Sequence, residues 1–376
     1  MFPRISFPRT LAQFSAGALL ANYEAIRAQV PCQSMLPMIK ANAYGHGAGW
    51  AARTLATMPG LYGFGVATLE EGEEVRKALG ARGRRTRIVV LSGTALWTEE
   101  KGRFCEKHGL TATVSNEEDW VRFLRGRWHE RIAYEIKFNT GMNRLGIPVN
   151  YARLIARALR NAPPEAHPSG ILSHLATADK PEEKLARGQL ESFKAVRSQL
   201  EPVCPGAHFH LANSSAIWNA KLWGLERLTD VVRPGISLYG VPPYPGAPAR
   251  GLHPVLTLKS QIVDRRALKP GETIGYGGSY RARESTEVAI LAIGYADGLK
   301  RGSTGHVLIG GRKYPFVGIV SMDLSAVVCP KSARPGDWAQ ILGPGIDPWE
   351  QARAAGTIPY EFLTSVAQRV ERTYEA

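Results

Sequence analysis

The sequence has few cysteines, and no two of them lie close together. Its 376 residues include only four, at Cys32, Cys105, Cys204 and Cys329, with no Cys-x-x-Cys pair. This spacing argues against a disulfide framework and a structural zinc site. No apolar run approaches the roughly 20 residues of a membrane helix. The start, from Met1 to Ser6, lacks the apolar stretch of a secretory signal. We therefore expect a cytoplasmic protein with no membrane partner.

Acidic residues are scarcer than basic ones. The chain has 33 Asp and Glu against 47 Lys and Arg, a formal net charge of +14. The basic residues lie in short groups such as 82–87, without the interleaved aromatic residues or known modules of nucleic-acid binders. A solvated basic surface is the simpler interpretation, so we expect no nucleic-acid partner.

Short β-type runs alternate with helical stretches between residues 34 and 240. The expected strands are Met35–Lys40, Leu61–Ala67, Ile88–Leu91, Thr111–Val114, Ile132–Phe138, Gly170–His174, His208–Leu211 and Asp230–Arg233. Two of the helices between them begin with capping-box patterns, Thr68 with Glu71 and Ser115 with Glu118. Eight strand–helix units in about 230 residues favour an α/β fold with an N-terminal (β/α)8 TIM barrel. The alternative is a doubly wound sheet, although its Gly-x-Gly-x-x-Gly turn is absent after the first strand.

A proline-rich segment, Val241–Pro248, precedes a second region in which the sequence pattern changes. There, β-type runs alternate with turns and predict a C-terminal all-β domain: Val255–Ile262, Glu287–Ile293, His306–Ile309, Leu324–Val328 and Trp338–Ile341. Two helices, Pro348–Ala355 and Tyr360–Thr373, would close the chain. We expect residues 1–11 to form an N-terminal strand joining the C-terminal domain, 12–243 the barrel, and 244–376 the β-rich domain.

The active site of such a barrel lies at the carboxyl ends of its strands. Here those ends are cationic or neutral-polar, with Lys40, Arg233 and the 137–144 segment among them. Paired carboxylates are missing, which argues against a glycosidase. His208 and His210 have no evident third ligand, which argues against a catalytic metal. The set suits an anionic, phosphorylated ligand, because Ser214 can begin a helix and Gly235 allows close backbone approach.

Lys40 follows the apolar segment Leu36–Ile39. A lysine at the rim of a dry barrel core loses its proton more easily, and a neutral amine can form a Schiff base. Taken alone, Lys40 is better explained as a solvated lysine that follows a strand. Its neighbours favour the functional interpretation, because small residues and two glycines keep the surroundings open while Tyr44 can donate to a phosphate.

The segment Lys40–Gly47, KANAYGHG, resembles the pyridoxal phosphate attachment motif of bacterial alanine racemases. Further similar segments recur in order over nearly the whole chain: Lys137 with Thr140–Gly146, His174–Asp179, Ala212–Ser214, Val232–Gly240, Gly275–Tyr280, Gly294–Gly298, Ser321–Asp323 and Ile358–Glu361. The resemblance implies a fold-type III enzyme that interconverts L-alanine and D-alanine with pyridoxal 5'-phosphate and supplies D-alanine for peptidoglycan. It also implies a homodimer whose subunits share their active sites.

The resemblance assigns the two catalytic bases to Lys40 on one face of the substrate and to Tyr276 of the partner subunit on the other. The implied cofactor-binding residues are Lys40, Tyr44, His174, Asn213, Ser214, Arg233, Gly235, Ile236 and Tyr360. Arg233 would face the pyridine nitrogen. Because a guanidinium stays charged and only donates hydrogen bonds, it would oppose ring protonation and limit side reactions. Arg144 and the backbone N–H of Met322 would hold the substrate carboxylate, and the entrance would comprise Asp179, Tyr295 and Asp323.

Two positions depart from the family pattern. Many members carry an aspartate where this chain has Asn139, close to Lys137, which is often carbamylated in the family. Either a carbamylated Lys137 or an anion such as chloride would then steer Arg144. The family often has an entrance arginine at the position of Ile319, where an apolar residue would change how substrates enter.

Other functions stay open on the sequence alone. A broader racemase of small amino acids, including serine, fits the same motifs. A fold-type III decarboxylase needs a carboxylate at the pyridine nitrogen, and Arg233 argues against it. A non-catalytic pyridoxal phosphate carrier would lack the β domain, and a barrel that binds phosphate without the cofactor is the remaining alternative.

Overall fold

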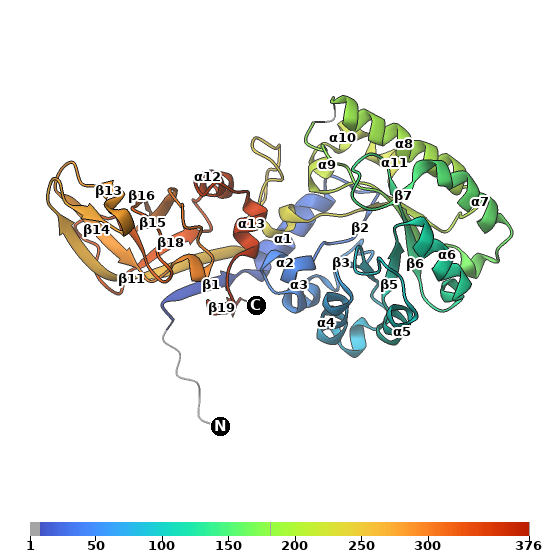
Figure 1. Cartoon of the computed structure of the whole chain (residues 1–376), viewed down its shortest axis with the longest axis horizontal. Coiled ribbons are helices and arrows are strands. Elements are labelled where there is room, and N and C mark those ends of the chain that lie inside the picture. The colour runs from blue at the N-terminus through green and yellow to red at the C-terminus, as the bar shows by residue number, and fades with distance from the viewer. Residues whose placement is uncertain (1–7, 181, 376) are drawn as a thin grey trace, which may run out of the picture.

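The computed structural model describes residues 8–180 and 182–375, which form an α/β barrel and a β domain (Figure 1). Residues 1–7, most of the predicted N-terminal strand, lie outside the described residues. Within the described ranges, no helix has both the length and the apolar character needed to cross a membrane.

Eight parallel strands form the barrel, as predicted. They are β2 (Ser34–Met35), β3 (Phe64–Val66), β4 (Ile88–Val90), β5 (Thr111–Val114), β6 (Tyr134–Asn139), β8 (Gly170–Leu172), β9 (His208–His210) and β10 (Val231–Val232). Strands β3 to β9 pair in sequence order, and β10 pairs with β2. Single bridges, Met35 to Leu61, Met38 to Gly65 and Asn213 to Arg233, connect the remaining neighbours and close the ring. A two-residue strand, β7 (Ile147–Pro148), adds to β6.

Helices surround this ring (Figure 1): α1 (Ala16–Arg27), α3 (Ala48–Leu55), α4 (Leu69–Leu79), α5 (Glu99–His108), α6 (Glu117–Arg125), α7 (Ala152–Arg160), α8 (Lys184–Leu200), α9 (Ser214–Trp218), α10 (Ala220–Trp223) and α11 (Leu225–Leu228). A short segment labelled α2 (Lys40–Tyr44) follows the first strand and has left-handed backbone angles inside it. The capping box of Thr68 and Glu71 is present. The prediction of a second box at Ser115 was wrong by one residue, because Asn116 caps α6 by accepting from the Asp119 N–H. The Asp119 carboxylate also accepts the N–H groups of residues 96 and 97, which anchors α6 in that register.

The second domain is a closed antiparallel barrel, which confirms the predicted all-β fold. Its strands are β11 (Leu256–Leu268), β14 (Thr286–Leu291), β15 (His306–Ile309), β16 (Arg312–Val317), β17 (Ser325–Val328) and β18 (Trp338–Leu342), with a separate hairpin of β12 (Thr273–Ile274) and β13 (Tyr280–Arg281). The sheet order β14-β17-β16-β15-β18-β11 is closed by pairing of β14 with β11. Strand β1 (Thr10–Phe14) pairs antiparallel with β11, so the beginning of the described chain belongs to this domain's sheet.

The predicted helix over Tyr360–Thr373 was wrong in its second half. Two short helices, α12 (Pro348–Ala354) and α13 (Pro359–Thr364), are followed by a strand, β19 (Glu371–Tyr374). This strand pairs in parallel with β1, and the rings of Phe14 and Tyr374 stack at 5.0 Å. Because the pairing partner lies at the opposite end of the chain, local periodicity could not reveal it.

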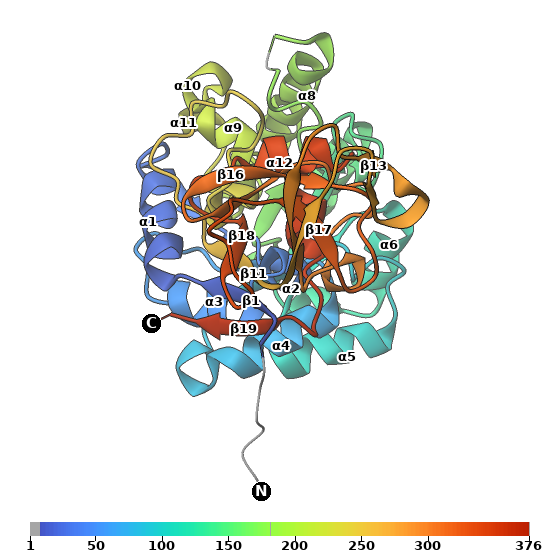
Figure 2. The same ribbon diagram turned by 90° about the vertical axis from the view of Figure 1, so that its left-hand side faces the viewer.

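Helix α13 of the second domain packs against the barrel at α2. Gly45 ends α2 with φ 84°, and a Cβ there would lie 2.4 Å from the carbonyl oxygen of Leu363. Only glycine allows this approach. Figure 2 shows the β domain in front of the barrel, with α12 among its elements, and Figure 1 shows α13 between that domain and the barrel. The two domains therefore meet next to the residues that follow the first barrel strand.

Candidate active site

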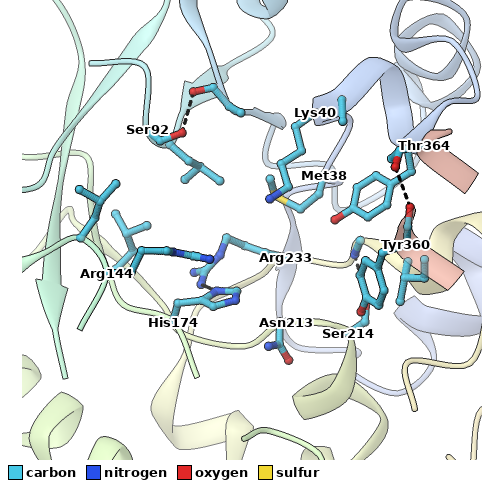
Figure 3. A pocket seen from close by; sticks show the side chains of 18 of the residues that line it. Met38, Lys40, Ser92, Arg144, His174, Asn213, Ser214, Arg233, Tyr360 and Thr364 are labelled. Atoms are coloured by element: carbon cyan, nitrogen blue, oxygen red, sulfur yellow. Dashed lines mark hydrogen bonds between the residues drawn. The ribbon is translucent and has the colours of Figure 1, made fainter. Parts of the chain in front are cut away.

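A cavity of about 730 Å³ opens at the carboxyl ends of the barrel strands (Figure 3). Its walls come from the ends of the barrel strands β2, β3, β4, β6, β8, β9 and β10 or the segments after them, and from α13 of the second domain. Eleven of the residues singled out from the sequence line it: Lys40, Tyr44, Lys137, Arg144, His174, Asn213, Ser214, Arg233, Gly235, Ile236 and Tyr360. The fold thus gathers residues that lie up to hundreds of positions apart in the chain.

The backbone directly after Lys40 is left-handed. Residues Ala41, Asn42, Ala43 and Tyr44 all have φ between 51° and 54°. For L-residues this conformation costs about 1–2 kcal/mol each, so surrounding contacts must offset it. Asn42 supplies two of them, since its carbonyl oxygen accepts the Gly47 N–H and its Oδ1 accepts the Ala48 N–H, both at 2.8 Å. The turn places both the Lys40 and Tyr44 side chains at the cavity.

The lysines of the cavity have weakened basicity. Burial, together with the charges of Arg144 and Arg233, holds the pKa of Lys40 below its usual range, against an opposing effect of Glu71. Burial and the same two arginines lower the pKa of Lys137 to about 8, with a further contribution from Lys40. At neutral pH both amines therefore have a larger neutral fraction than a surface lysine, which makes them better nucleophiles.

Arg233 is held in a buried network. Its Nη1 lies 3.0 Å from Nδ1 of His210 and donates to the His210 carbonyl oxygen at 2.7 Å, and its Nη2 lies 3.3 Å from Nδ1 of His174. Behind His210, the carboxylate of Glu135 lies 3.0 Å from Nε2. Burial lowers the pKa of Arg233 to about 10, with Glu135 opposing, so the guanidinium stays charged at neutral pH. Figure 3 shows Arg233 and His174 facing the cavity together.

Ser214, Gly235, Tyr44 and Tyr360 form a cradle at one end of the cavity. The Ser214 Oγ accepts the Gly235 N–H at 2.9 Å, and a Cβ on Gly235 would lie 2.5 Å from the Tyr44 hydroxyl. The two tyrosine rings lie 6.1 Å apart. Burial, with a smaller effect of Asp179, raises the pKa of Tyr360 to about 12, and burial raises that of Tyr44 as well. Both phenols therefore remain proton donors, as an anion requires.

Arg144 is exposed and lines the cavity from the loop after β6. Asn139 shapes this loop: its Oδ1 accepts the N–H groups of Gly141 (3.1 Å) and Asn143 (3.0 Å), and its Nδ2 donates to the Asn143 side chain at 2.9 Å. The Asn139 amide thus holds the turn that leads to Arg144. Among the described residues, no hydrogen bond or ion pair is seen at the Arg144 guanidinium, which can therefore bind an anionic group.

Five predicted site residues do not line the cavity of their own chain. Four of them lie on the second domain: Tyr276, Tyr295, Met322 and Asp323. Tyr276 is 66% exposed on a turn between Gly275 and Gly277, which have φ of 79° and 66°. Asp323 pairs with Arg369 at 2.8 Å. The fifth, Asp179, is exposed but acts on the nearby Tyr360.

Glu135 and Glu71 were not predicted as site residues. Glu135 stands on β6 between the buried Tyr134 and Ile136, and a charged residue inside an apolar strand is the signal that could have revealed it. Glu71 was predicted only as a helix-capping residue, but it also accepts the N–H of Ala41 at 2.7 Å. No local sequence signal indicates this second contact.

Comparison with protein families gives two matches that together span most of the chain. Residues 15–243 match the alanine racemase N-terminal domain, and residues 255–374 match the alanine racemase C-terminal domain. An alanine racemase of Nitrosococcus oceani is 36% identical, the alignment covering 99% of this chain and 100% of that protein. An alanine racemase of Deinococcus radiodurans is 35% identical over 97% of this chain and 99% of that protein.

Solved structures give the same result. The biosynthetic alanine racemase from Pseudomonas aeruginosa superimposes with a TM-score of 0.88 at 32% identity, covering 98% of this chain and 100% of that one. The alanine racemase from Bartonella henselae, solved with covalently bound pyridoxal phosphate, superimposes with a TM-score of 0.84 at 30% identity, covering 98% of this chain and 99% of that one.

Proposed function

This chain belongs to the alanine racemase family of enzymes, and we propose that it interconverts L-alanine and D-alanine using two bases, Lys40 and Tyr276 of the partner subunit. One observation carries the proposal: a lysine of lowered pKa and two guanidiniums, Arg144 and Arg233, share one cavity with a cradle for an anion. An amine, a carboxylate site and a phosphate site are what a pyridoxal phosphate enzyme acting on an amino acid needs.

The cavity fits pyridoxal 5'-phosphate. The cradle has a serine, two protonated phenols and a glycine whose missing Cβ leaves room beside Tyr44, so Tyr44, Ser214, Gly235, Ile236 and Tyr360 would hold the phosphate. Asn213, which caps α9 by accepting the Ala216 N–H, would keep Ser214 in place. When bound, the cofactor supplies an electron-withdrawing ring that makes the α-hydrogen of an attached amino acid acidic.

Arg233 would face the pyridine nitrogen and His174 would hold its orientation. Because Arg233 is charged and can only donate hydrogen bonds, it would disfavour a proton on the ring nitrogen of a bound cofactor. At that position Arg233 would favour return of the proton to the α-carbon over side reactions such as transamination. It would also be unsuited to a decarboxylase, which needs a carboxylate there.

Racemisation needs a proton to leave one face of the α-carbon and another to arrive on the opposite face. Lys40 would serve one face. Tyr276 lies outside the cavity of its own chain and is exposed, so it would serve the other face from the partner subunit of a homodimer. The proposed dimer also accounts for the exposure of Met322 and Tyr295 on the same domain.

The substrate carboxylate would bind Arg144 and the backbone N–H of Met322 of the partner subunit. Asp179, Tyr295 and Asp323 would line the entrance and restrict it to small side chains. Lys137, whose pKa is about 8, would react with carbon dioxide through its neutral amine and release a proton. The carbamate so formed would carry a negative charge that steers Arg144.

The test is a coupled assay with both alanine enantiomers, serine, ornithine, lysine and diaminopimelate, alongside absorbance scans before and after borohydride. We expect racemisation of alanine above all others and a cofactor absorbance that borohydride removes. Faster serine turnover would indicate the broader racemase, carbon dioxide release a decarboxylase, and a spectrum without cofactor a phosphate-binding barrel.

The biological role is part of the proposal. We infer that the enzyme supplies D-alanine for peptidoglycan from the cytoplasm, a role supported by its similarity to the biosynthetic enzyme of Pseudomonas aeruginosa. Deletion of the gene in the source bacterium should create a requirement for D-alanine. Growth on L-alanine lost without any such requirement would indicate a catabolic role instead.

A further inference from the structure

One carboxylate connects two barrel segments beside the cavity. In Glu71, at the start of α4, Oε1 accepts the Ala41 N–H at 2.7 Å, while Oε2 accepts the N–H groups of Ala67 at 2.7 Å and Thr68 at 3.3 Å. Ala41 directly follows Lys40, and Ala67 directly follows β3. Both alanines line the cavity, whereas Glu71 itself does not. The contact therefore reaches the cavity only through the backbone.

The left-handed turn after Lys40 needs such a contact. Within the turn, the N–H of Ala43 bonds to Ile39 and that of Gly45 bonds to Ala41, each less than 3 Å away in the i to i−4 pattern. The Ala41 N–H stands at the beginning of the turn, where a helix offers no internal acceptor. Glu71 supplies the acceptor, and its charge makes the bond stronger than a neutral one.

We propose that Glu71 is a positioning residue for Lys40: its carboxylate fixes the peptide group directly after Lys40 and thereby aims the amine into the cavity. The inference rests on the proposed role of Lys40 in binding the cofactor. Glu71 would then have two roles, because it caps α4 and also connects α4 to the turn that follows Lys40.

The charge of Glu71 provides a signature that a purely structural role would lack. The charged groups that act on Lys40 are Arg144, Arg233 and Lys137, which favour its neutral form, and Glu71, which favours its charged form. Removing the Glu71 charge should therefore shift the titration of Lys40 to lower pH. A variant that only loosened the fold would expose Lys40 to water and shift the titration to higher pH.

Glu71→Gln is the informative substitution. A glutamine keeps the side-chain length but has only one oxygen that can accept a hydrogen bond. Its NH2 group must then face the backbone N–H of either Ala41 or Ala67, so that one of these two hydrogen bonds is lost. Glu70→Gln is the matched control, because Glu70 is adjacent, exposed and in the same first turn of α4. Glu71→Asp keeps the charge but shortens the reach, and it serves as the second variant should Glu71→Gln fail to fold.

The experiment measures cofactor attachment rather than turnover. Apo-protein is mixed with pyridoxal phosphate over a range of pH, reduced with borohydride at timed intervals, and the label on the Lys40 peptide is quantified by mass spectrometry. The rate of Lys40 labelling should rise with pH to a plateau. For Glu71→Gln we expect the labelling rate at this plateau to fall about tenfold, because a charged hydrogen bond is lost. We also expect the midpoint of the pH dependence to move to lower pH. Glu71→Asp should also lower the labelling rate at the plateau but move the midpoint less than Glu71→Gln does. Glu70→Gln should have the labelling rate and the midpoint of the wild type.

The outcomes separate this inference from the proposed function. If the wild-type Lys40 peptide takes up no label, the proposed role of Lys40 fails. If the wild type is labelled and Glu71→Gln shows the same plateau rate and midpoint, the positioning role of Glu71 is overturned. A midpoint shifted to higher pH would overturn it too, since that result indicates a loosened fold.

Discussion

Glu135 and His210 face each other in the barrel core, with Oε2 and Nε2 3.0 Å apart and both side chains 0% exposed. Burial opposes ionisation of Glu135, but His210, Arg87 and Arg233 outweigh it and hold the pKa of the carboxyl below its usual range. Burial also keeps the pKa of His210 low, so this imidazole is neutral at neutral pH. A neutral His210 that accepts from Arg233 at Nδ1 carries its proton on Nε2, beside the Glu135 carboxylate.

The first prediction concerns this chain of groups. Glu135→Ala leaves the Arg233 charge without its buried counter-charge, so we expect the free energy of unfolding to fall by about 3–5 kcal/mol. Urea denaturation measures this free energy. Glu130→Ala, which breaks an exposed ion pair with Arg127, is the control that we expect to change stability less.

Glu135→Gln keeps the shape of the side chain but removes its charge. It should raise the amount of pyruvate formed by transamination per racemisation, because Arg233 is held less firmly. Equal losses in Glu135→Ala and Glu130→Ala would contradict the account.

The second prediction concerns Lys137. With a pKa of about 8, roughly a tenth of its amine is neutral at pH 7 and can add carbon dioxide. Isotope-labelled bicarbonate should therefore give a carbamate carbonyl signal by NMR that Lys137→Gln abolishes. Protein freed of carbon dioxide should show a KM for L-alanine raised about tenfold, because Arg144 is less well oriented. Absence of the signal, with activity that rises on chloride addition, would favour the bound anion instead.

The third prediction concerns His46, which is fully buried and donates from Nδ1 to the carbonyl oxygens of Ala43 and Tyr44 at 3.0 Å. Burial lowers its pKa from 6.5 to about 4. The unfolded chain takes up this proton as pH falls through 6.5 while the folded chain does not. The residue should therefore remove about 3 kcal/mol of stability between pH 6.5 and pH 4.

His46→Gln can donate to the same carbonyls but does not titrate. Its free energy of unfolding should accordingly depend less on pH in that window than the wild-type value. His174 and His210, whose pKa values are also lowered by burial, are present in both proteins and cancel in the comparison. Parallel pH profiles for the two proteins would show that His46 carries no such linkage.

The barrel could be predicted because each of its strands is marked by a local apolar run. Each of the eight runs contains barrel-strand residues, although the run Met35–Lys40 shares only Met35 with β2. The last strand of the chain, β19, could not be predicted in this way, because it pairs with β1 and the two strands are neighbours only after folding. The same limit applies to the site. Arg233 directly follows β10 and Lys40 follows β2 within five residues, which a sequence pattern reveals. The contact of Glu71 with Ala41 arises from a left-handed turn that no local signal indicates.

Residues on the second domain pose a different problem. Tyr276 was predicted as a base only through family resemblance, and in the single chain it lies outside the cavity. Its physical setting, an exposed tyrosine between two left-handed glycines, fits a side chain presented to another subunit. No property of one chain can show where that side chain ends in a dimer.

The most direct test of the central claim is therefore subunit complementation between Lys40→Ala and Tyr276→Phe. Each variant alone should be nearly inactive. When the two are unfolded, mixed in equal amounts and refolded, half of the dimers are hybrids, and each hybrid has one site with both an intact Lys40 and an intact Tyr276. The refolded mixture should recover about a quarter of wild-type alanine racemisation. A mixture that stays as inactive as its components would contradict a site shared between two subunits.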